Sequence, residues 1–129
     1  MKKILFVCVH NSGRSQMAEA FFNHLAQGKA VATSAGTLPA ESINPAVVKA
    51  MREVGFDTSR QQPKLLTLEM LENADRVITM GCNVADVCPA SLVPTEDWAL
   101  DDPEGKTLKE VRRIRDEVRT RVQKLINEL

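Results

Sequence analysis

Apolar and polar residues alternate along the chain in blocks that predict strands and helices in turn. Residues 4–9 form an unbroken apolar run rich in branched side chains, which indicates a strand buried on both faces. Shorter segments of the same kind at 31–33, 76–80 and 95–98 predict three more strands. We therefore expect four strands, separated by segments of a different periodicity.

Between and after these strands, apolar residues recur at helical spacing. The residue types at the helix starts support this, because Asn44, Thr67 and Thr107 are preferred N-caps and Pro45 suits a first helical position. The last helix directs its apolar stripe toward the core, and this stripe includes Leu129. The predicted helices span 15–25, 45–54, 68–71 and 108–129.

The order of these elements predicts the fold class. Parallel strands need a long crossover connection, which helices between strands supply. We expect an α/β fold, a three-layer sandwich with a four-stranded parallel sheet flanked by helices. At 129 residues, without repeat or linker, the chain is expected to form one domain, residues 1–129.

Charge and cysteine content limit the ligands and the cysteine chemistry that we expect of this chain. The 17 basic and 17 acidic residues cancel, so no overall field favours nucleic acid or an acidic membrane, and an anion needs a local site. No apolar run is long enough for a signal peptide or a membrane span, so we expect a cytoplasmic monomer with reduced thiols. The odd count of three cysteines excludes a fully paired disulfide framework.

Residues 8–15, Cys-Val-His-Asn-Ser-Gly-Arg-Ser, connect the first predicted strand to the first helix. Ligands of a parallel sheet bind beyond the carboxyl ends of its strands, and N–H groups at a helix start converge on anions. The segment therefore predicts a loop that holds a tetrahedral oxyanion. Its expected donors are the main-chain N–H groups of Val9, His10, Asn11, Ser12 and Gly13, and the Arg14 guanidinium.

Cys8 is the candidate nucleophile of this loop. A helix N-terminus and a neighbouring arginine lower the pKa of a cysteine thiol and favour the reactive thiolate. Ser15 could donate a hydrogen bond to the sulfur and ease its departure as a leaving group. The alternative is a buried strand-end cysteine and a surface arginine whose spacing is accidental.

A second chemical feature is the pair Asp101-Asp102 before Pro103. Transfer of an oxyanion to sulfur expels an oxygen that leaves more readily when protonated, so a carboxylic acid is expected nearby. The alternative is a solvated acidic turn ahead of the last helix.

These segments resemble a known family. Residues 8–14 followed by Ser-Gln-Met-Ala-Glu-Ala are similar to the opening of low-molecular-weight protein tyrosine phosphatases, and more closely to arsenate reductases built on that fold. Further matching segments follow in family order at 34–36, 44–45, 101–103 and 115–117. The resemblance implies that Asp102 is the general acid and that arsenate is the substrate.

Cys82 and Cys88 follow the third predicted strand and should emerge at the same sheet edge as Cys8. The resemblance implies a relay: Cys82 attacks Cys8, Cys88 attacks Cys82, and thioredoxin reduces the final bridge. The thioredoxin-coupled family usually spaces the two cysteines one residue further apart, so glutathione with glutaredoxin, or mycothiol, stays open as the donor. Two unconnected buried thiols are the alternative.

The resemblance also raises the question of a metal. Some family members bind potassium, and Asn11, Glu19 and Ser34 match ligand positions, but Lys64 stands where an aspartate is expected. An ammonium cannot ligate a cation, so we predict no metal and no cofactor.

Two other functions compete with arsenate reduction. A phosphatase would use only Cys8, Arg14 and Asp102, although Glu104-Gly105 replaces the tyrosines that follow Pro103 in eukaryotic phosphatases. A non-catalytic thiol sensor of redox state or oxyanions would use the cysteines to switch a partner interaction.

Overall fold

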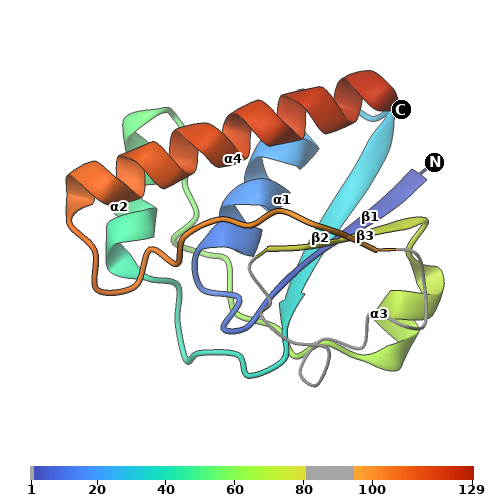
Figure 1. The fold of residues 1–129 in the computed structure, drawn as a ribbon, viewed down its shortest axis with the longest axis horizontal. Helices are drawn as coiled ribbons and strands as arrows, with labels where there is room; N and C mark the ends of the chain where they lie inside the picture. Colours follow the sequence, from blue (N-terminus) through green and yellow to red (C-terminus); the bar gives the residue numbers. More distant parts are fainter. Residues whose placement is uncertain (1, 81–94) are drawn as a thin grey trace.

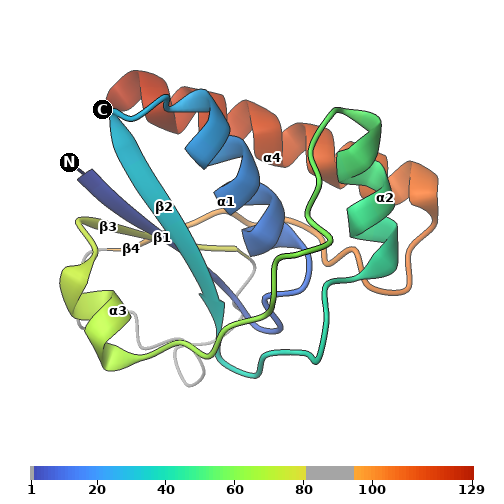
Figure 2. The ribbon, with the colours of Figure 1, turned by 180° about the vertical axis from the view of Figure 1, so that it is seen from behind.

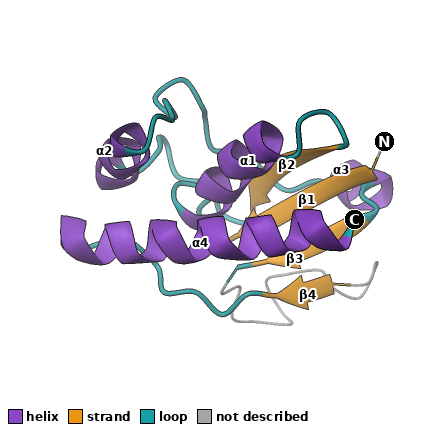
Figure 3. Ribbon diagram, turned by 90° about the horizontal axis from the view of Figure 1, so that it is seen from above, coloured by secondary structure: helices purple, strands orange, loops and turns teal. Residues whose placement is uncertain are grey.

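The computed structural model describes residues 2–80 and 95–129 of the chain. Its elements follow in the order β1 (Lys2–Cys8), α1 (Arg14–Leu25), β2 (Ala30–Gly36), α2 (Pro45–Glu53), α3 (Leu68–Asn73), β3 (Arg76–Thr79), β4 (Thr95–Asp97) and α4 (Leu108–Glu128). The four strands form one parallel sheet in the order β2-β1-β3-β4 (Figure 3). The predicted fold class is therefore confirmed.

Helices cover both faces of the sheet. Figures 1 and 2 show α1, α2 and α4 gathered on one side and α3 on the other. Alternate side chains of β1 explain this arrangement, because neighbouring residues of a strand point to opposite faces. Ile4 and Phe6 belong to the larger core with α1, α2 and α4, whereas Leu5 and Val7 pack with Leu71 of α3.

Helix starts agree with the residue types predicted to cap them. The Asn44 side chain accepts a hydrogen bond from the Ala46 N–H at 2.9 Å, and Pro45 is the first residue of α2. The hydroxyl oxygens of Thr67 and Thr107 accept from main-chain N–H groups of α3 and α4. A capping side chain satisfies N–H donors that have no partner within the helix. Helix starts can therefore be predicted from the residue types at and next to the cap.

Element ends differ from the prediction by a few residues. β2 is longer than the predicted 31–33, because small residues at its ends continue the pairing with β1. The placement of Leu129 in the core is wrong: it follows the last residue of α4 and is 43% exposed. Helical periodicity does not fix the position of Leu129, because the residue lies after the last turn of α4 and no further turn extends the apolar stripe of the helix.

Among the helices of the described ranges, none combines the length and the apolarity that a membrane crossing needs.

Candidate active site

The predicted anion loop lies between the end of β1 at Cys8 and the start of α1 at Arg14. β1 is an inner strand with β2 and β3 on either side, so the loop leaves the centre of the sheet at its carboxyl edge. The Cys8 side chain is buried, at 2% exposure, and is a free thiol. The loop therefore occupies the position where parallel sheets bind ligands.

Carbonyl groups of this loop bond outward. The carbonyl oxygens of Val9, His10 and Ser12 accept from the N–H groups of Leu38, Ala40 and Asn44, which belong to the segment after β2. A trans peptide plane carries its N–H opposite its carbonyl. The N–H groups of His10, Asn11 and Gly13 therefore turn to the inner side of the loop.

The Cys8 sulfur lies on that inner side. The Asn11 N–H donates to Cys8 Sγ at 3.2 Å, and Asn11 reaches this position in the left-handed region, with φ of 50°. Asparagine tolerates that region better than most residues. Among the described residues, no acceptor pairs with the N–H groups of His10, Ser12 or Gly13. Of these, the N–H groups of His10 and Gly13 turn to the inner side of the loop, where an oxyanion beside Cys8 would accept from them.

Ser15 supplies a second contact to the sulfur, and its neighbours fix the direction of the hydrogen bond that it receives from Asn11. The Lys64 N–H can only donate, so the Asn11 Oδ1 that it contacts at 2.8 Å is an acceptor. Asn11 Nδ2 then donates to Ser15 Oγ at 2.7 Å. A Cys8 thiolate can only accept, so in that form the Ser15 hydroxyl donates to Cys8 Sγ at 2.8 Å. Donation to sulfur stabilises a thiolate relative to a thiol.

Two glycines allow the loop to pack closely against its neighbours. A Cβ on Gly36, at the end of β2, would lie 2.5 Å from the Val9 carbonyl oxygen. A Cβ on Gly13 would lie 2.7 Å from Pro103 Cγ. Both contacts are shorter than a side chain tolerates, so glycine at these positions brings β2 and the loop of Pro103 against the anion loop.

Arg14 joins the anion loop to the segment after β4. Arg14 is 6% exposed, and its Nη1 donates to the Leu100 carbonyl at 2.9 Å. Nη2 lies 3.8 Å from Asp102 Oδ2. The predicted arginine is thus at the loop, with one arm held by the main chain and the other directed toward the candidate acid.

The two aspartates of the acid loop have different partners. Asp102 is 47% exposed on its side chain, faces Arg14 and accepts from the Glu104 N–H at 3.0 Å. Asp101 instead pairs with Arg113 of α4 at 3.0 Å. Of the two carboxylates, Asp102 is therefore the one directed toward the anion loop.

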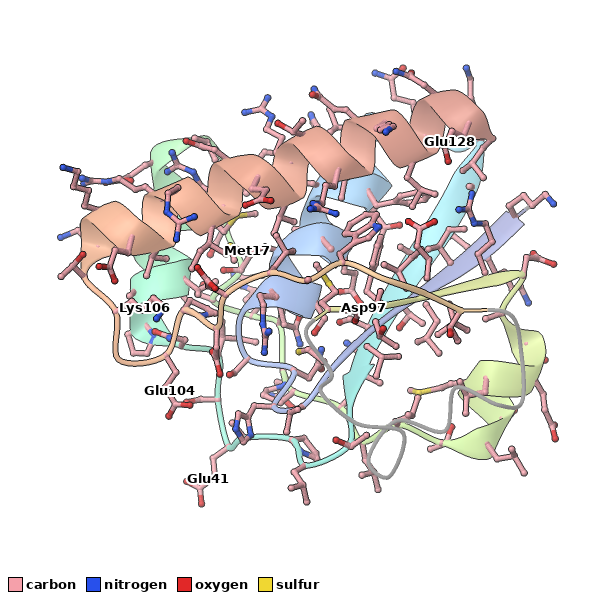
Figure 4. The ribbon with its side chains drawn as sticks, in the orientation of Figure 1. Met17, Glu41, Asp97, Glu104, Lys106 and Glu128 are labelled. Atoms are coloured by element: carbon pink, nitrogen blue, oxygen red, sulfur yellow. The ribbon has the colours of Figure 1, made fainter. Side chains whose placement is uncertain are left out.

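A pocket of about 290 Å³ opens beside the anion loop. Ser12 of the loop, Ser42 and Asn44 of the segment after β2, and Glu104 of the acid loop contribute to its walls. Figure 4 shows Glu104 on the strand-to-helix loop below the start of α4, with Lys106 nearby. An acidic side chain therefore borders this pocket, and the chain contains no tyrosine.

The residues matched to potassium ligands do come together. Glu19 Oε1 accepts from Ser34 Oγ at 3.1 Å, and the Lys64 ammonium lies 3.4 Å from the same oxygen. Asn11 contacts the Lys64 main chain. The Lys64 ammonium therefore places a positive charge next to the Glu19 carboxylate. Within the described residues, no group of three or more His, Cys, Asp or Glu side chains is arranged to hold a metal ion.

Two contributors were missed by sequence reasoning. Gln16 is fully buried, and its Nε2 donates to the carbonyl oxygens of Asn11 and Gln62. The Leu100 carbonyl holds Arg14. A glutamine on the buried side of the first helical turn was an available signal for Gln16, whereas nothing local marks a main-chain carbonyl 86 residues away. Cys82 and Cys88 lie outside the described residues, so their approach to Cys8 stays a prediction.

Comparison with known proteins identifies the family of the chain. The family model described as "Low molecular weight phosphotyrosine protein phosphatase" matches residues 3–129. An arsenate reductase of Shouchella clausii is 43% identical, over 95% of this chain and 94% of that protein. A glutaredoxin arsenate reductase of Synechocystis sp. is 41% identical, over 98% of this chain and 97% of its own.

A solved structure shows the same fold. The thioredoxin-dependent arsenate reductase Cg_ArsC1' of Corynebacterium glutamicum superposes with a TM-score of 0.83 and 39% identity, covering 99% of this chain and 61% of its own. Both the family model and these relatives span nearly the whole chain. The chain therefore belongs to the low-molecular-weight phosphotyrosine protein phosphatase family, and within it to the group of the arsenate reductases.

Proposed function

We propose that this enzyme reduces arsenate to arsenite, with Cys8 as the nucleophile. The observation that carries the proposal is the environment of the Cys8 sulfur: it accepts from the Ser15 hydroxyl and the Asn11 N–H inside a loop whose N–H groups turn inward. A thiolate next to donors for a tetrahedral anion is the arrangement that oxyanion transfer requires. The names of the relatives select arsenate among the oxyanions.

The first step forms a bond between Cys8 sulfur and arsenic. Arsenate is bound by the loop N–H groups and by Arg14 Nη2, the guanidinium nitrogen that does not donate to Leu100, and the thiolate displaces one arsenate oxygen. Asp102, directed toward Arg14, gives that oxygen a proton so that it departs as water. Arsenic remains in its oxidised state in this adduct.

Reduction follows when a second thiolate attacks the Cys8 sulfur. A disulfide forms between Cys8 and Cys82, the sulfur–arsenic bond breaks, and its electron pair leaves with arsenic as arsenite. Cys88 then attacks Cys82, which releases Cys8 as a thiolate and leaves a Cys82–Cys88 bridge. An external dithiol or two small thiols reduce this bridge, which is chemistry suited to the cytoplasm.

Three external electron donors are alternatives for the last step, and each can be tested separately. Relatives carry both glutaredoxin and thioredoxin in their names. Purified enzyme is therefore incubated with arsenate and, in turn, thioredoxin with its reductase, glutathione with glutaredoxin, and mycothiol with its partner. Arsenite formed in each arm identifies the donor, whereas no arsenite in any arm would contradict the proposed activity.

The relay is tested by replacing its two thiols one at a time. Cys82→Ser and Cys88→Ser should both keep p-nitrophenyl phosphate hydrolysis at Cys8 and both lose multiple-turnover arsenate reduction. Their failures should differ: Cys88→Ser completes one turnover and accumulates a Cys8–Cys82 bridge, whereas Cys82→Ser forms no bridge to Cys8.

Peptide mapping under non-reducing conditions, after one equivalent of arsenate, identifies the bridge. Normal turnover by both variants with a small-thiol donor would make Cys8 the only essential cysteine. Phosphate ester hydrolysis without arsenate reduction would instead favour a phosphatase, and binding of oxyanions without either reaction would favour a sensor.

A further inference from the structure

A layer of hydrogen-bonded polar side chains contacts the anion loop through the Asn11 side chain. It connects Glu19 of α1 with residues of the segment between α2 and α3. Gln61 Nε2 contacts both Gln16 Oε1 and Glu19 Oε2. Gln16 Nε2 contacts Asn11 Oδ1 at 2.9 Å. The layer thus reaches the same Asn11 side chain that orients Ser15.

Every hydrogen bond in this layer has a defined direction. The Lys64 ammonium and main-chain N–H only donate, and the Asn11 and Gln62 carbonyls only accept. Gln16 must therefore present its amide nitrogen to Asn11 and its oxygen to Gln61. The donors run in one sense from Gln61 through Gln16 and Asn11 to the Ser15 hydroxyl on Cys8.

Glu19 is the charged group of this layer. Its side chain is 15% exposed, and it accepts from Ser34, Gln61 and Lys64. Within residues 2–80 and 95–129, the Lys64 ammonium is the only basic group within 4 Å of that carboxylate. The other charged pair at the loop joins Arg14 to Asp102 of the acid loop and does not involve Glu19. A carboxylate so little exposed is costly without a cationic partner.

Lys64 also contacts the loop through its main chain. Its N–H donates to Asn11 Oδ1 at 2.8 Å, and its carbonyl accepts from the Gly36 N–H at 2.8 Å. One residue therefore holds Asn11 and the end of β2 with its backbone while its side chain pairs with α1. Loss of the ammonium removes the side-chain anchor and leaves Glu19 uncompensated in the same layer.

We propose that Lys64 is a positioning residue for the Cys8 nucleophile: its ammonium neutralises Glu19 and thereby holds the side chains that direct the Ser15 hydroxyl at the sulfur. This role rests on the proposed function in one respect, namely that Cys8 reacts as a thiolate. Lys64 itself touches neither the sulfur nor the oxyanion, and acts through Glu19, Asn11 and Ser15.

The test measures alkylation of Cys8 by iodoacetamide and so does not depend on arsenate turnover. All proteins carry Cys82→Ser and Cys88→Ser, which leaves Cys8 as the only thiol of the chain. Lys64→Met, which removes the charge and keeps the length, should slow alkylation at neutral pH by about fivefold, as loss of one oriented hydrogen bond would. Its rate should also rise to the plateau at higher pH than that of the parent.

Charge restoration separates positioning from a general loss of structure. Lys64→Arg keeps the cation and should alkylate within about twofold of the parent. The double variant Lys64→Met with Glu19→Gln removes both charges and should likewise return to within about twofold. Lys29→Met, an exposed lysine beside the opposite end of β2, is the control for loss of a positive charge and should show no change.

Three outcomes would overturn the proposal. Parent-like alkylation by Lys64→Met would show that the ammonium is not needed. A double variant as slow as Lys64→Met would show that the lysine does not act by neutralising Glu19. A parent thiol that reacts no faster at neutral pH than free cysteine would remove the thiolate on which both this role and the proposed function rest, whereas either of the first two results leaves the proposed function intact.

Discussion

The two halves of the active site are built in opposite ways. On the nucleophile side, Cys8, Asn11 and Ser15 are at most 2% exposed and joined by directed hydrogen bonds. On the acid side, the Asp102 carboxylate is 47% exposed and lies 3.8 Å from Arg14. Buried hydrogen bonds set the geometry of the first half before substrate arrives, whereas solvent reaches the second. The difference suits their tasks, because a thiolate needs fixed donors and an acid needs to regain its proton from water.

Loss of the nucleophile gives the largest expected effect. Cys8→Ser should abolish both arsenate reduction and p-nitrophenyl phosphate hydrolysis, because a serine hydroxyl stays protonated where the thiolate forms. The loop donors remain, so phosphate should still bind when measured by calorimetry. Residual turnover within about tenfold of the parent would contradict the nucleophile assignment.

Removal of the acid should weaken catalysis without disturbing the thiol. Asp102→Asn should slow adduct formation by roughly 10²–10⁴, the usual range for a lost general acid. The measurement is p-nitrophenyl phosphate hydrolysis at mildly acidic pH, with alkylation of Cys8 expected at the parent rate. Asp101→Asn is the matched control, since its partner is Arg113 of α4; if this variant is the slower one, the acid is misassigned by one residue.

The contact between the two halves can be broken at Gly13. In Gly13→Ala the new Cβ would lie 2.7 Å from Pro103 Cγ, so the acid loop and the anion loop must separate at this contact. Misplacement on this scale should reduce hydrolysis by about 10- to 100-fold. Because the hydrogen bonds of Cys8 do not pass through Pro103, alkylation should change little. Equal losses in both assays would show that the halves are not independent.

The smallest effect is expected at an ion pair away from both halves. The hydrogen bond from Arg112 is the main cause that lowers the pKa of Glu53 from its usual value of 4.5. A lowered carboxyl pKa contributes stability above that pH and loses it as pH falls through the folded-state pKa. Glu53→Gln should therefore lower Tm slightly at neutral pH and less at pH 3, with catalysis unchanged.

Thermal unfolding of parent and Glu53→Gln at both pH values measures this difference. A gap in Tm that stays constant between neutral and acidic pH would contradict the linkage to Glu53. An accompanying loss of p-nitrophenyl phosphate hydrolysis would show that α2 and α4 reach the site in a way that the ion pair does not suggest.

Local patterns determined the elements and the order of the chemistry along the chain. The apolar run of β1, the caps at Asn44, Thr67 and Thr107, and the strand-loop-helix context of residues 8–15 all depend on residues within a few positions of each other. Hydrophobic periodicity and capping act over that range, so the sequence alone is enough to predict these features.

Tertiary structure decided which distant groups complete the site. The donor to Asn11 Oδ1 comes from Lys64, 53 residues away, and the acceptor for Arg14 from Leu100, 86 residues away. No local preference specifies either contact, because both depend on which loops the packed sheet brings to one edge. The orientation of the Asn11 amide toward Ser15 follows from those long-range contacts. Asp102 was already expected as the acid from the family resemblance, and the structure adds that it is Asp102, and not Asp101, that lies beside Arg14.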